Sequence, residues 1–133
     1  MKYLLIILSC LCFSLSLAQA NEIHEERIQF EAGKSGATIN GQIKGYKIVD
    51  YLLHAEAGQT ISVKFAANFT SAYFNLLPPE NPIALFTGSI AGHSYNGVLP
   101  LTGVYKIRVY LMRNAARRGS TAKYKLTLKI EGN

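Results

Sequence analysis

The chain has 133 residues, a formal net charge of +6 and two cysteines, and 49% of its residues are hydrophobic. This length suits a single domain with its own hydrophobic core. Both cysteines, Cys10 and Cys12, lie in the first twenty residues, so a fold held together by disulfides is excluded for the rest of the chain.

The first twenty residues have the pattern of a cleavable secretory signal peptide. Lys2 precedes an apolar run from Tyr3 to Leu17, and Ala18-Gln19-Ala20 supplies the small-x-small pattern of a cleavage site. A membrane-spanning helix needs about 20 apolar residues, and this run is shorter. The sequence therefore predicts an exported protein that begins at Asn21 and does not insert into a membrane.

Residues 21–133 are predicted to form one all-β domain. Apolar and polar residues alternate with period two, and no helical period extends over a dozen residues. Such runs occur near 27–30, 37–43, 46–55, 60–66, 72–77, 83–86, 94–99, 104–112 and 122–130. We therefore expect an antiparallel β-sandwich of about eight strands, because a sheet with one apolar face must be covered by another.

Two short segments have the composition of tight turns. Ala57-Gly58-Gln59 and Pro100-Leu101-Thr102-Gly103 each separate two predicted strands. We expect both of them to be hairpin turns.

The positive charge is concentrated in the last third of the chain. Residues 101–133 contain eight bases and one acid, whereas residues 21–100 contain five bases and seven acids. This asymmetry favours an acidic partner near the C-terminal third. Nucleic acid would fit the charge, but an exported protein does not meet it, so no nucleic-acid partner is predicted.

Residues suited to catalysis or metal binding are few and scattered. Asp50 and seven glutamates are the only acids, and no paired carboxylates or nucleophile with a neighbouring base can be recognised. His24, His54 and His93 lie far apart in the sequence without ligand spacing. The sequence predicts no enzyme, no metal site and no cofactor.

The segment 112–121, which joins the last two predicted strands, is the best candidate for a functional loop. Ten residues is long for such a connection. The alanines between Arg113 and Arg117 favour a short helical turn, and a spacing of four places both guanidinium groups on one face. The alternative is a solvated basic loop that aids solubility.

Several motifs resemble the periplasmic inhibitors of goose-type (g-type) lysozyme. They are Gly41-Gln42-Ile43-Lys44-Gly45-Tyr46, the run from Tyr51 to Gln59, the run from Leu99 to Val109, Arg113-Asn114-Ala115-Ala116-Arg117 and Lys123-Tyr124. Most of the chain after residue 20 follows this family in order and register, except the stretch 66–96. The Ala-Gly-Gln turn and the Gly-x-Tyr strand also occur in the wider group of pre-peptidase C-terminal-like β-sandwiches.

The resemblance implies a fold, a partner and a site. The family fold is an antiparallel β-sandwich, and one of its loops enters the active-site cleft of the lysozyme. The family's inhibitory residues match Tyr46, Arg113 and Arg117, and we add Asn114 and Arg118 to the predicted lysozyme-binding set. Tyr46 has an alternative interpretation as a core tyrosine.

The predicted function is therefore that of a periplasmic protein that blocks a g-type lysozyme with its basic loop and protects peptidoglycan. The alternative is a non-catalytic β-sandwich that binds anionic glycan or peptidoglycan fragments on the same basic surface. The sequence also leaves a homodimer open, because exposed edge strands can pair.

Overall fold

The computed structural model describes residues 22–132. The predicted signal peptide, residues 1–20, lies outside the described residues. The first strand of the described chain begins at Ile23.

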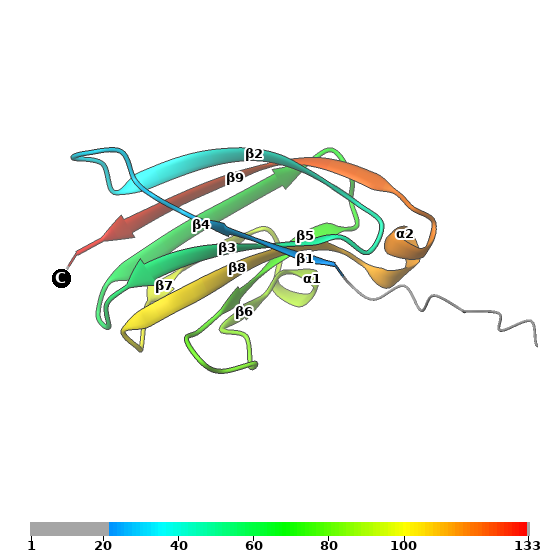
Figure 1. Cartoon of the computed structure of the whole chain (residues 1–133). Helices are drawn as coiled ribbons and strands as arrows, with labels where there is room; N and C mark the ends of the chain where they lie inside the picture. The colour runs from blue at the N-terminus through cyan, green and yellow to red at the C-terminus, as the bar shows by residue number, and fades with distance from the viewer. Residues whose placement is uncertain (1–21, 133) are drawn as a thin grey trace, which may run out of the picture.

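Nine strands and two short helices make up the described chain (Figure 1). In chain order they are β1 (Ile23–Arg27), β2 (Gly36–Lys44), β3 (Ile48–Ala55), β4 (Thr60–Ala67), β5 (Ala72–Leu77), β6 (Phe86–Thr87), α1 (Gly88–Ala91), β7 (Ser94–Val98), β8 (Gly103–Leu111), α2 (Arg113–Arg117) and β9 (Thr121–Glu131). They form a five-stranded sheet in the order β1-β3-β8-β5-β6 and a four-stranded sheet in the order β2-β9-β4-β7. The predicted all-β sandwich is confirmed.

The core lies between the two sheets and follows the predicted alternation. On β8, Tyr105, Ile107 and Val109 are fully buried, while the residues between them are half-exposed. On β9 the same alternation buries Leu126 and Leu128. Each of these strands therefore contributes an apolar face to the core and a polar face to the surface.

The edge strand β1 differs from the prediction in place and direction. It spans Ile23–Arg27 rather than 27–30, all five residues are exposed, and it pairs with β3 in parallel. Ile28 and Phe30, which suggested a strand, pack against the core just after β1. The sequence pattern misses β1 because only its backbone hydrogen bonds, and no buried side chains, make it a strand.

The expected hairpin turns are also wrong, because both segments connect different sheets. Residues 57–59 lead from β3 in one sheet to β4 in the other, and residues 100–103 lead from β7 to β8. Every connection between successive strands in the described chain crosses between the sheets except that of β5 with β6. The long β8–β9 connection is therefore a crossing at one end of the sandwich, where α2 lies (Figure 1).

Candidate functional site

Helix α2 is a short helix of five residues, and backbone hydrogen bonds within the same segment stabilise both of its ends. The Ala116 N–H donates to the Met112 carbonyl at 2.9 Å, and the Ser120 N–H donates to the Ala115 carbonyl at 3.0 Å. Gly119 follows the last helical turn with φ of +68°, a left-handed conformation that glycine adopts without steric cost. The short helical turn predicted from the alanines is therefore present.

The two alanines of α2 anchor it to the core. Ala115 and Ala116 are buried, at 0% and 4% exposure, and belong to the main hydrophobic cluster. Arg113, Asn114 and Arg117 are exposed, as is Arg118 immediately after the helix. The small buried face thus holds the backbone down and leaves the basic side chains in solvent.

Two further hydrogen bonds tie the ends of the connection to neighbouring turns. The Met112 N–H donates to the Ser71 carbonyl at 2.9 Å, and the Gly45 N–H donates to the Ser120 carbonyl at 2.9 Å. Gly45 has φ of +61°, and a Cβ atom built on it would lie 3.6 Å from the Ala116 carbonyl oxygen. The turn between β2 and β3 is therefore pressed against α2.

This close approach brings Tyr46 beside the basic helix. Tyr46 is half-buried and packs partly against the core, so it is neither a core tyrosine nor a fully exposed one. Together with Arg113 it lines a groove of about 290 Å³, which we call the Tyr46 groove. Lys47 and Ala116 also line it, so the groove lies where the β2–β3 turn meets α2.

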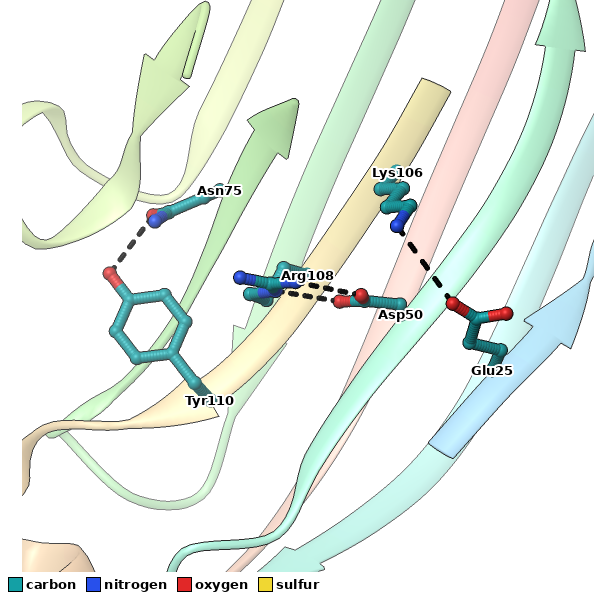
Figure 2. Close-up of polar contacts among 6 residues, drawn as sticks. All are labelled: Glu25, Asp50, Asn75, Lys106, Arg108 and Tyr110. Atoms are coloured by element: carbon teal, nitrogen blue, oxygen red, sulfur yellow. Dashed lines mark hydrogen bonds and ion pairs between the residues drawn. The ribbon is translucent and has the colours of Figure 1, made fainter. Parts of the chain in front are cut away.

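The floor of the Tyr46 groove includes residues of β8 and β5 that the sequence did not single out. Arg108, Tyr110 and Asn75 line it and belong to the outer face of the five-stranded sheet. Figure 2 shows that the Tyr110 hydroxyl donates to Asn75 Oδ1, at 2.9 Å. The same Oδ1 accepts the Gly88 N–H at 3.1 Å, which holds the Asn75 amide in place.

Arg108 is held in the groove by a buried carboxylate. Its Nε and Nη2 donate to the two Asp50 oxygens at 2.8 and 2.9 Å (Figure 2). Asp50 is fully buried, whereas the Arg108 side chain is 31% exposed. The hydrogen bonds that Arg108 donates to Asp50 raise the pKa of Arg108. This paired arginine gives the groove a fixed, largely neutralised floor.

Within the described residues, the arginines of segment 112–120, which we call the α2 connection, have no such partner. Within residues 22–132, Arg113, Arg117 and Arg118 form no ion pair, whereas Lys106 on β8 approaches Glu25 at 3.8 Å (Figure 2). Their guanidinium groups are free to pair with carboxylates of another molecule.

The structure brings only part of the predicted site into one cavity. Tyr46 and Arg113 line the groove together, while Asn114, Arg117 and Arg118 lie on the exposed surface of the α2 connection and are not among the groove residues. The alternation of basic residues on β8 was visible in the sequence and placed Arg108 outside the core. The alternation alone could not show that Arg108 pairs with Asp50, which lies on another strand.

Metal and membrane features can be reported only for residues 22–132. Within this range no three His, Cys, Asp or Glu side chains form a group that could hold a metal ion. None of the helices there has the length and apolar character needed to cross a membrane.

Comparison with known proteins finds similarity to inhibitors of g-type lysozyme. No family model matches the chain. A crystal structure from Aeromonas hydrophila, described as PliG, a periplasmic lysozyme inhibitor of g-type lysozyme, is 34% identical with a TM-score of 0.76, and the match covers 84% of this chain and 100% of that one. An inhibitor of g-type lysozyme from Escherichia coli K12 is 28% identical over 128 residues, which are 95% of this chain and 93% of that protein.

A more distant similarity concerns the fold alone. The pre-peptidase C-terminal domain of a collagenase from Bacillus anthracis is 16% identical, with a TM-score of 0.57 over 84% of this chain. The wider β-sandwich group suggested by the Ala-Gly-Gln turn is therefore confirmed at the level of architecture.

Proposed function

This chain belongs to the family of periplasmic inhibitors of g-type lysozyme, and we propose that it binds a g-type lysozyme in the periplasm and blocks its active-site cleft with the α2 connection. The relatives are inhibitors rather than enzymes, which agrees with the prediction that this chain is not an enzyme. The observation that carries the proposal is the 34% identity over the whole length of a solved inhibitor.

The chemistry of the α2 connection supports its role as the blocking element. Glycoside hydrolases of the lysozyme kind hold a carboxylic acid in their cleft. Arg113 and Arg117 are exposed and carry no partner within residues 22–132. A guanidinium binds a carboxylate through two parallel hydrogen bonds, so an arginine of α2 is suited to pair with the catalytic carboxyl group in the cleft.

Tyr46 adds a second anchor next to the arginines. Its ring is partly packed against the core, which fixes its position before binding. A tyrosine of this kind offers a large contact area at a small loss of side-chain entropy. We therefore assign Tyr46 and Arg113 to the centre of the contact and Asn114, Arg117 and Arg118 to its exposed part.

The test is inhibition of a purified g-type lysozyme acting on bacterial cell walls. Removal of one partner of a buried charge pair costs about 2 kcal/mol or more, so Arg113→Ala should raise the inhibition constant about 30-fold or more, whereas Arg117→Ala, in the exposed part of the contact, should raise it less. Arg27→Ala is a matched control, since Arg27 is an exposed arginine on β1.

Two results would contradict the proposal. A lysozyme left fully active by a micromolar excess of the unmodified protein would exclude inhibition. Unchanged inhibition by the Arg113→Ala, Arg117→Ala double variant would exclude the α2 connection as the contact. Retention of the protein on cell-wall fragments without inhibition would instead support the glycan-binding alternative.

A further inference from the structure

The outer face of the four-stranded sheet carries an unusual set of charges. Its strands β2, β4, β7 and β9 contain no arginine and one acidic residue, Glu131. They contain five exposed lysines, which we call the lysine face: Lys44, Lys64, Lys123, Lys125 and Lys129.

Strand pairing gathers these lysines on one surface. On β9, Lys123, Lys125 and Lys129 alternate with buried Tyr124, Leu126 and Leu128, so they all point away from the core. Lys64 on β4 pairs with Thr127, between Lys125 and Lys129. Lys44 ends the neighbouring strand β2, opposite Thr121.

Most of this charge is unpaired inside the chain. Lys129 approaches Glu131 at 2.9 Å, and both side chains are about 60% exposed, which makes this a weak surface pair. No other lysine of the face forms an ion pair within residues 22–132. Between the lysines the sheet presents short uncharged polar side chains such as Thr38, Asn40 and Ser62.

The two basic regions of the molecule differ in their chemistry. The α2 connection uses arginines, whose planar fork suits single carboxylates, whereas the sheet uses only lysines, which act as flexible point charges. The lysines are spread over three strands and do not converge on one cleft. We propose that the lysine face binds the phosphate headgroups of an anionic membrane surface, which presents many negative charges on a plane.

The location of the face allows this contact without blocking the proposed inhibitory site. Arg108, Tyr110 and Asn75 of the Tyr46 groove lie on the outer face of the other sheet, across the core. Figure 1 shows the two sheets as separate layers, with α2 at one end of the sandwich. A periplasmic protein lies between two membranes, so an anionic surface is within reach.

The experiment measures co-sedimentation of the processed protein, purified from the periplasm, with phosphatidylglycerol–phosphatidylcholine vesicles. Each lysine near an anionic surface contributes roughly a five-fold gain in partitioning, so Lys123→Gln with Lys125→Gln should lower binding about 30-fold. Binding should also weaken steeply as salt is raised, and vesicles of phosphatidylcholine alone should bind little.

The control is Arg27→Gln with Lys106→Gln, which removes the same charge from β1 and β8 of the other sheet. The control variant should bind vesicles like the unmodified protein, and both double variants should still inhibit a g-type lysozyme. An equal loss in the two double variants would overturn the proposal, because net charge alone would then explain binding. No binding to phosphatidylglycerol vesicles, or binding to peptidoglycan sacculi alone, would also overturn it.

Discussion

The hydroxyl groups of Tyr51 and Tyr124 meet at 2.6 Å inside the sandwich and join the two sheets by one hydrogen bond. Tyr51 belongs to β3 and Tyr124 to β9, and both rings are buried, at 3% and 5% exposure. One hydroxyl donates and the other accepts, so each satisfies its neighbour in a site where an unpaired polar group would be costly.

This tyrosine pair predicts a loss of stability at alkaline pH. Burial raises the pKa of both hydroxyls, and the hydrogen bond with Tyr51 raises that of Tyr124 further. An unfolded tyrosine loses its proton at a pH of about 10. Above that pH the folded state retains protons that the unfolded state has lost, so the free energy of unfolding falls as pH rises, while below it the stabilisation is complete.

Urea unfolding at pH 8, 9.5, 10.5 and 11 checks this prediction. The unmodified protein should lose up to about 1.4 kcal/mol per pH unit for each tyrosine above pH 10, and the Tyr51→Phe, Tyr124→Phe variant should lose less. Tyr73→Phe, on the half-buried outer face of β5, should follow the unmodified protein. Equal slopes in all three proteins would contradict the assignment.

The Asp50–Arg108 pair predicts that the stability losses of Arg108→Ala and Asp50→Asn do not add up in the double variant. Arg108→Ala leaves the fully buried Asp50 without its two hydrogen bonds and should cost about 3 kcal/mol. Adding Asp50→Asn to Arg108→Ala removes the stranded charge and should recover part of that loss. Denaturant unfolding of the four proteins measures the coupling, and additive losses would show that the pair contributes nothing specific.

Gly45 makes a prediction about the turn that carries Tyr46. Its φ of +61° is strained for most side chains, so Gly45→Ala should destabilise the protein by about 1 kcal/mol. Gly45→Asn should cost less, because asparagine tolerates this conformation better. Thermal unfolding of both variants checks the order, and the reverse order would argue against the left-handed turn.

Much of the architecture followed from residue patterns, because burial imposes them. The alternation on β8 and β9 exists because each strand has one face in the core, and it indicated both strands correctly. Ala115 and Ala116 indicated a helical turn because alanine is a strong helix former, and the structure shows in addition that both are buried. The sheet order was not visible in the sequence, since turns at 57–59 and 100–103 look like hairpins although they cross between sheets.

Sequence motifs indicated single residues of the Tyr46 groove but not the groove itself. Arg113 and Tyr46 were named from separate motifs, and they line one groove where the Gly45 N–H donates to the Ser120 carbonyl between their two segments. The register of the strands decides which other residues line the groove. It places Arg108 opposite both Asp50 and Asn75, and it brings Tyr110 to the same face of the sheet. A single sequence without this register gives no reason to associate residues so far apart.

The buried alanines of α2 provide the last prediction, which links packing to the proposed inhibition. Ala115 is fully buried, so Ala115→Leu must overpack the core beneath α2 and should destabilise the protein by about 1–3 kcal/mol. Displacement of α2 should also weaken inhibition of a g-type lysozyme at temperatures where the variant is still folded. Ala66→Leu, at an exposed position on β4, is the matched control and should change neither property. If Ala115→Leu lowered stability but inhibited as well as the unmodified protein, the fixed position of α2 would not be what presents its arginines.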